Sequence, residues 1–146
     1  MTKEAVAVCG HGRQIKYLEK LKERGMPISS FLFSGRDGLG KKTIALSFVA
    51  GLFCKEKKAP GALACLNCED CRKVVSGMHP DFAIIEGDNE IGIQQIRELK
   101  RRLALSSYAG SYRGVLIDDA HLLTSDAEGA LLKILEEPAA NSLFFL

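Results

Sequence analysis

One segment in the first third of the chain constrains its fold more than any other. From Phe31 to Cys54 the sequence reads FLFSGRDGLGKKTIALSFVAGLFC, an apolar stretch, a glycine-rich turn, two lysines and a second apolar stretch. A strand, such a turn and then a helix make up a phosphate-binding loop, in which glycines let backbone N–H groups point at phosphate oxygens. A chance glycine-rich turn is the alternative. The phosphate-loop interpretation predicts an α/β fold with a helix at about residues 41–53.

The loop predicts a nucleotide site that lacks one ligand. The pattern G-x-x-x-x-G-K-[ST] is met at Gly35, Gly40 and Lys41, and Lys41 would reach the β- and γ-phosphates. The next position normally supplies a hydroxyl to Mg²⁺, and here it is Lys42. Thr43 has a hydroxyl but lies about 100° further round the helix, and the sequence leaves open whether it substitutes. The candidate nucleotide-binding residues are Gly35, Gly38, Gly40, Lys41, Lys42, Thr43 and Asp118.

An apolar segment later in the chain, GVLIDDAH, ends in two acids. In phosphate-loop ATPases the first acid supports Mg²⁺ and the next, usually Glu, orients the attacking water. Asp118 takes the first position and Asp119, the one candidate catalytic residue, takes the second. Asp is one methylene shorter than Glu, which misplaces a water by about an ångström and costs on the order of a hundredfold in rate. Two surface acids that cap the next helix are the alternative interpretation.

Four of the five cysteines lie in one short stretch, at Cys54, Cys65, Cys68 and Cys71. Four thiolates can close a tetrahedral Zn²⁺ site that has no room for water, which predicts a structural rather than a catalytic metal. Iron–sulfur clusters use similar spacings, and a disulfide would conflict with a reducing compartment. We expect a zinc-binding insert at about 54–75, and we expect the fifth cysteine, Cys9, to be a small buried residue.

Length and composition indicate one ordinary globular domain. The 146 residues are 47% hydrophobic and 26% charged, and a net charge of +2 creates no strong field toward nucleic acid or membrane. No apolar run approaches the roughly 20 residues that a membrane span needs, and the start of the chain lacks the layout of a signal peptide. We therefore expect a cytoplasmic protein without a membrane partner.

Predicted helices and strands alternate along the chain. Helical patterns cover about 11–25, 41–53, 91–105 and 125–138, the third with Ile93, Ile96, Leu99 and Leu103 on one face and the last with Ser125 or Asp126 as N-cap. Short apolar runs at 29–35, 81–88, 113–121 and 141–146 read as strands. Such alternation argues for a parallel sheet covered by helices on both faces.

Taken in order, these segments resemble the N-terminal part of a bacterial DNA polymerase III clamp-loader subunit of the AAA+ class. The segments FLFSGRDGLGKKTIA, the four-cysteine insert and IDDAHLLTSDAEGALLKILEEP carry the resemblance, with Gly129 where Asn is usual. The form EGDNEIGIQQIREL is similar to the delta-prime group of subunits. Gamma and tau motor subunits usually carry intact GKT and DE boxes, which this chain lacks.

The resemblance implies an AAA+ phosphate-loop fold with strand order 5-1-4-3-2, truncated here before the fifth strand. Residues 1–146 would be a partial nucleotide-binding domain, with the lid and collar domains absent. The strand near Phe31–Phe33 would then be an edge, which favours self-association. The implied role is a largely non-hydrolysing stator within the polymerase III holoenzyme, with ATPase activity absent or weak. An ATP-hydrolysing motor subunit is the alternative.

The implied partners are the gamma/tau and delta subunits, the sliding clamp and primer–template DNA. Phosphate contacts are expected from four basic residues of one helix, namely Arg97, Lys100, Arg101 and Arg102. A solvated helix face with Glu98 interspersed is the alternative. Direct nucleic-acid binding by the cysteine insert is a third hypothesis, disfavoured because the insert lacks aromatic residues that stack on bases.

Overall fold

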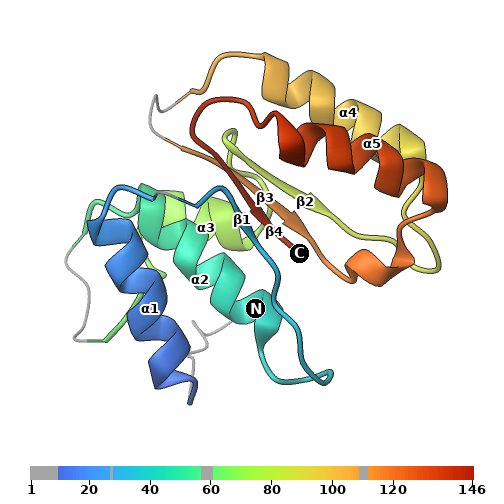
Figure 1. Cartoon of the computed structure of the whole chain (residues 1–146). Helices are drawn as coiled ribbons and strands as arrows, with labels where there is room; N and C mark the ends of the chain where they lie inside the picture. The colour runs from blue at the N-terminus through green and yellow to red at the C-terminus, as the bar shows by residue number, and fades with distance from the viewer. Residues whose placement is uncertain (1–9, 27, 57–60, 109–111) are drawn as a thin grey trace. The chain divides into compact units, whose positions relative to one another are not determined.

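The computed structural model describes residues 10–26, 28–56, 61–108 and 112–146, so Cys9 lies outside the described residues. The chain divides into two compact units, each described here by itself. The first comprises residues 1–27 and 34–79, and the second comprises residues 28–33 and 80–146. Figure 1 colours the chain by residue number.

A parallel sheet forms the centre of the second unit. Its strands are β1 (Ser30–Phe31), β2 (Phe82–Ile85), β3 (Arg113–Ile117) and β4 (Ser142–Phe145). They lie in the order β1-β4-β3-β2, and every neighbouring pair is parallel. The predicted parallel sheet is therefore confirmed, and the order is the one that the resemblance implied for four strands.

The first strand is short, but its pairing continues beyond the two residues assigned to it. Phe144 donates to Ser29 O at 2.8 Å, and Phe33 donates to Leu146 O at 2.8 Å. The rings of Phe31 and Phe145 stack with centroids 5.0 Å apart. Among the described strands, β1 pairs with β4 alone, and self-association through this edge stays a prediction.

Two helices, α4 (Ile93–Ala104) and α5 (Ser125–Glu136), lie side by side along one face of the sheet (Figure 1). They bury one apolar face each against the strands, which is the main stabilising contribution in this unit. The core includes Ile96, Leu99 and Leu103 of α4, Leu131 and Ile134 of α5, and Val115, Ile117 and Phe144 of the sheet. Ile93, expected on the same face, is only half-buried because it is the first residue of α4.

The start of α5 differs from the prediction by one residue. Its N-cap is Thr124, whose Oγ1 accepts a hydrogen bond from Ala127 N at 3.3 Å. The predicted caps, Ser125 and Asp126, already lie inside the helix. An N-cap needs extended backbone angles, and Thr124 has them, with φ −69° and ψ 156°. A short 3₁₀ helix, η1 (Ala120–Leu122), precedes this cap.

The first unit holds three helices, α1 (Gly12–Glu23), α2 (Lys41–Phe53) and α3 (Glu69–Val75). In α1 the predicted apolar face is confirmed, since Ile15, Leu18 and Leu21 are buried. Gly25 follows this helix in the left-handed region at φ 77°, as a helix-ending glycine does. The bounds of α2 agree with the prediction, and it buries side chains all round, including Ile44, Phe48 and Val49. In the described residues no helix is both long and apolar enough to cross a membrane.

One buried hydroxyl in the sheet leads to a test of stability. Ser142 is 2% exposed, and its Oγ has no hydrogen-bond partner among the described residues. An unsatisfied buried hydroxyl is destabilising, so we expect Ser142→Ala to raise the free energy of unfolding by about 1 kcal/mol or leave it unchanged. Urea denaturation followed by circular dichroism measures this. Ser76→Ala is the control, because that hydroxyl donates to Lys73 O at 3.1 Å. A loss above about 1 kcal/mol in Ser142→Ala would show that this hydroxyl has a partner.

Candidate functional site

The glycine-rich loop stands directly before α2 in the first unit. Gly38 and Gly40 have φ of 77° and 83°, left-handed angles that other residues adopt only with strain. Gly40 is the N-cap of α2, so the backbone N–H groups of the first helical turn follow the loop without a side-chain cap. A helix start of this kind attracts anions. The predicted layout of turn and helix is therefore present.

The ammonium group of Lys41 is held by the loop itself. Lys41 Nζ donates to Gly35 O at 2.6 Å and to Arg36 O at 3.5 Å, and it lies 3.8 Å from Asp37 Oδ1. Asp37 was not among the predicted site residues. Asp37 lies in the turn before α2, so the helical i,i+4 spacing does not apply to it and no simple sequence pattern predicts this contact. His11 was also missed, and its Nε2 donates to Leu39 O at 3.1 Å.

Lys42 and Thr43 occupy the first turn of α2, and both are half-buried. The position that would offer a hydroxyl to Mg²⁺ is therefore held by an amine-bearing side chain. This arrangement retains positive charge for a phosphate but removes a metal ligand.

The two predicted acids belong to the second unit, at the carboxyl end of β3. Asp118 donates its backbone N–H to Ile85 O at 2.9 Å. Asp119 adopts left-handed angles at φ 54° and precedes η1, although its side chain makes no capping hydrogen bond. Its Oδ1 lies 3.9 Å from His121 Nδ1, and both side chains are exposed. The alternative interpretation was that these acids cap the next helix. For Asp119 this interpretation is wrong, because its carboxylate accepts no capping hydrogen bond.

The four predicted cysteines come together within the first unit. Cys54 is the C-cap of α2, Cys65 precedes α3 in a loop, Cys68 is the N-cap of α3 and Cys71 lies in its first turn. Their four sulfur atoms all lie within 4.8 Å of one another. Cys71 is fully buried and the other three are half-buried.

Backbone N–H groups favour the thiolate of one cysteine of the cluster, Cys65. Cys65 Sγ accepts N–H groups from Asn67 at 3.5 Å and from Cys68 at 3.3 Å, and these two bonds lower the pKa of Cys65 to about 6. Burial raises the pKa of Cys68 and, more strongly, that of Cys71. A bound cation removes such protons because the metal replaces them.

The sulfur geometry fits a single tetrahedral metal. Cys65 Sγ and Cys71 Sγ are 3.8 Å apart, close to the edge of a tetrahedron with metal–sulfur bonds of about 2.3 Å. An iron–sulfur cluster attaches its cysteines to different irons and would hold the sulfurs further apart. The donor set therefore fits one thiophilic ion, and the cysteine insert is a candidate metal centre.

The basic residues predicted on α4 fall into two groups. Arg102 donates to Phe82 O at 3.2 Å, and Arg101 forms an ion pair with Glu98. Arg97 and Lys100 are exposed, and neither has a hydrogen-bond or ion-pair partner among the described residues. Of the four predicted cations, Arg97 and Lys100 are therefore the better candidates for binding an external anion.

Comparison with known proteins identifies relatives of this chain. A sequence profile described as "DNA polymerase III, delta subunit" matches residues 10–146. The DNA polymerase III subunit delta' of Pseudomonas aeruginosa is 31% identical over 130 residues, covering 87% of this chain and 39% of that protein. In Bacillus subtilis, subunit delta' is 31% identical over 135 residues, covering 92% and 40%. Subunit tau of the same organism is 32% identical over 117 residues, covering 80% and 20%.

The chain thus spans at most about two-fifths of the length of these relatives, between 20% and 40%. Among similar solved structures is that of a DNA polymerase III gamma subunit-related protein from Thermotoga maritima. Its TM-score is 0.65 at 23% sequence identity, and the match covers 91% of this chain and 38% of that one. This likeness supports the fold alone.

Proposed function

The chain belongs to the family of DNA polymerase III clamp-loader subunits that includes delta-prime, tau and gamma, and on that premise we propose that it acts as a delta-prime subunit. In this role it is a largely non-hydrolysing stator that helps load the sliding clamp onto primed DNA during replication. Overall identity does not separate the two groups, since delta-prime and tau relatives stand at 31% and 32%.

One observation carries the choice of delta-prime over a motor subunit. Lys42 stands where a motor subunit needs the hydroxyl that binds Mg²⁺. Asp119, with its shorter side chain, supports the same choice because it would hold an attacking water poorly. The proposed nucleotide-contacting residues are Gly35, Gly38, Gly40, Lys41, Lys42, Thr43 and Asp118.

We further propose that residues 1–146 are part of an AAA+ nucleotide-binding domain, since the order of the four strands and the loop before α2 suit that class. Lid and collar domains would lie in the portion that the longer relatives add. The proposed setting is the cytoplasm, and the proposed partners are gamma/tau, delta and the sliding clamp.

The metal that we propose for the cysteine insert is Zn²⁺, held by Cys54, Cys65, Cys68 and Cys71. With four sulfur ligands it would supply no catalytic chemistry. The residues themselves explain its use, because Cys54 ends α2 while Cys68 and Cys71 begin α3. Holding these sulfurs together would tie the end of α2 to the start of α3.

Contact with primer–template DNA is proposed for Arg97 and Lys100, which are exposed on successive turns of α4. Each phosphate contact that is lost should lower the salt dependence of DNA binding by about one counterion. Arg101 and Arg102 are weaker candidates because Glu98 and Phe82 O already engage them.

Calorimetry with ATP and ADP, with and without Mg²⁺, tests the stator proposal on the zinc-loaded protein. We expect weak binding that Mg²⁺ leaves unchanged. In Lys42→Thr, which restores the hydroxyl, we expect Mg²⁺ to tighten ATP binding about fivefold or more. Lys42→Ala is the matched control, because it removes the amine without adding a hydroxyl, and it should leave ATP binding insensitive to Mg²⁺.

A second measurement uses the assembled clamp loader containing the full-length protein. If the subunit is a stator, Lys41→Ala leaves ATP turnover by the complex unchanged. Wild-type binding that tightens with Mg²⁺, together with lost turnover in Lys41→Ala, would instead identify a motor subunit.

A further inference from the structure

We propose that Asp37 is an anion built into the phosphate loop, which lowers the affinity of the loop for phosphate ligands in proportion to their charge. The inference rests on the proposed nucleotide-contacting role of the loop. It concerns a residue that the loop pattern leaves unassigned, because Asp37 stands at one of the four variable positions between Gly35 and Gly40.

Contacts around Lys41 carry the argument. Its ammonium has three protons to donate, and three oxygens of the loop surround it. Two are the carbonyls of Gly35 and Arg36, at 2.6 and 3.5 Å, and the third is Asp37 Oδ1 at 3.8 Å. At 3.8 Å the Asp37 carboxylate is too far for a hydrogen bond, so a phosphate that binds Lys41 would lie beside this carboxylate. Of these loop oxygens, only that of Asp37 is charged.

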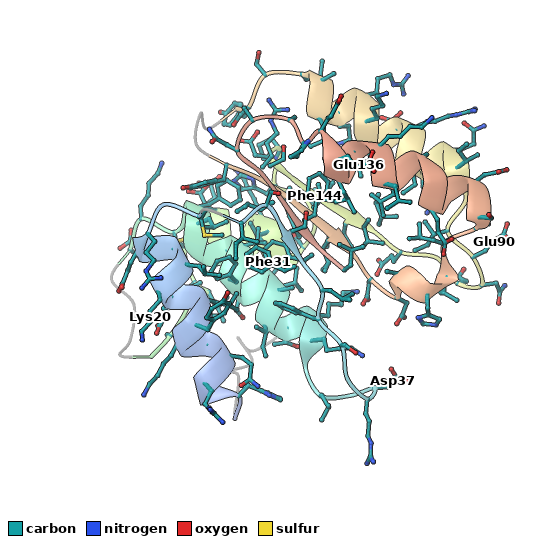
Figure 2. The ribbon with its side chains drawn as sticks, in the orientation of Figure 1. Lys20, Phe31, Asp37, Glu90, Glu136 and Phe144 are labelled. Carbon is teal, nitrogen blue, oxygen red and sulfur yellow. The ribbon has the colours of Figure 1, made fainter. Side chains whose placement is uncertain are left out.

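The position of Asp37 makes its effect electrostatic. Figure 2 labels it at the outer turn of the loop before α2, and its side chain is fully exposed. A surface ion pair of this kind adds little to folding, so removing the charge should leave the fold intact. For binding the effect is larger, since a phosphate beside Lys41 would place two or more negative charges within reach of the carboxylate.

The size of the effect follows from Coulomb attraction and screening. Two unit charges about 6 Å apart in water change an equilibrium constant about two- to threefold, depending on salt. The effect grows with each further charge on the ligand. Loss of the carboxylate should therefore help ATP more than ADP, and ADP more than inorganic phosphate. A purely structural role of Asp37 would give the same change for all three ligands.

Calorimetry on the full-length, zinc-loaded protein tests this, using Mg²⁺-free ATP, ADP and inorganic phosphate. In Asp37→Asn we expect ATP to bind about tenfold more tightly and ADP about fivefold more tightly in low salt. Both gains should shrink in 0.3 M salt. Asp37→Glu keeps the charge and should retain wild-type affinity. If only Asp37→Asn binds measurably, the gain is a lower limit and the proposal stands.

Glu23→Gln is the matched control within the same unit. Glu23 ends α1, whose first residues lie beside the loop through the hydrogen bond from His11 to Leu39 O. Glu23 lies eleven positions after Gly12, or about 16 Å along the helix, so loss of the Glu23 charge should change affinity less than twofold.

Three outcomes would overturn the proposal: equal gains for ATP, ADP and phosphate, an Asp37→Glu protein that behaves like Asp37→Asn, or no binding in either wild type or Asp37→Asn. Failure of the stator role is a separate result. It would appear as ATP turnover by the assembled complex that Lys41→Ala lowers, whatever the charge dependence at Asp37.

Discussion

Replacing Cys71 by serine is expected to abolish stoichiometric Zn²⁺ binding and to unfold much of the first unit. Structural zinc sites in small modules contribute apparent free energies on the order of 10 kcal/mol, comparable to the whole stability of a domain. Cys71 is the fully buried member of the cluster, and its Sγ lies 3.8 Å from Ala50 O in α2. Serine puts a hydroxyl, a poor zinc ligand, at the point where α3 meets α2.

Metal content by atomic emission and thermal unfolding by circular dichroism measure this effect. We expect wild type to hold one zinc per chain and to lose helical signal when a strong chelator is added. Added zinc should restore wild type but not Cys71→Ser. Cys54→Ser is the milder comparison. Cys54 is half-buried at the end of α2, so its replacement should weaken zinc binding less than that of Cys71. A Cys71→Ser protein that keeps one zinc and melts within a few degrees of wild type would contradict the structural role.

Much of the fold could be predicted because its elements are marked by strong local signals. The bounds of α2 follow from the glycine before it and from the unbroken apolar stretch up to Phe53. The strands are apolar runs that the structure buries, such as Ser142–Phe145, where all four residues are buried. In the same way the spacing of the cysteines anticipated that four sulfurs would meet.

Elements and contacts that depend on long-range partners could not be predicted. The seven-residue helix α3 is too short to show an apolar period, and it begins where Cys68 caps it. The basic face of α4 looked uniform in sequence, yet Arg102 turns to a backbone carbonyl at Phe82, 20 residues away in the chain. Backbone carbonyls are acceptors at every residue, so no side-chain pattern announces them. For the same reason, the hydrogen bond from Lys41 Nζ to Gly35 O could not be predicted from the sequence.

Gly87 lies in the turn between β2 and α4, and Gly87→Ala is expected to destabilise the second unit by about 2–3 kcal/mol. A Cβ at Gly87 would lie 2.2 Å from Glu90 O and 2.8 Å from Glu90 C. These are backbone atoms, which cannot swing aside as a side chain does. Glycine is required here by space, because the chain folds back onto itself within three residues.

Neighbouring hydrogen bonds prevent that backbone from yielding. Ile91 is fully buried, its N–H donates to Leu122 O at 2.8 Å, and its carbonyl accepts from Thr124 N at 3.0 Å. Moving Glu90 would therefore pull on both the start of α4 and the N-cap of α5. Urea denaturation of the zinc-loaded protein measures the loss.

Gly129→Ala supplies a control of opposite sign. Gly129 lies within α5, and a Cβ there would meet nothing within 4 Å. Alanine favours a helix over glycine by up to about 1 kcal/mol, so this variant should be as stable as wild type or more so. The same substitution would thus stabilise one glycine position and destabilise the other. Equal changes at both positions would contradict the prediction, because they would mean that the turn accommodates a Cβ at Gly87 despite its 2.2 Å approach to Glu90 O.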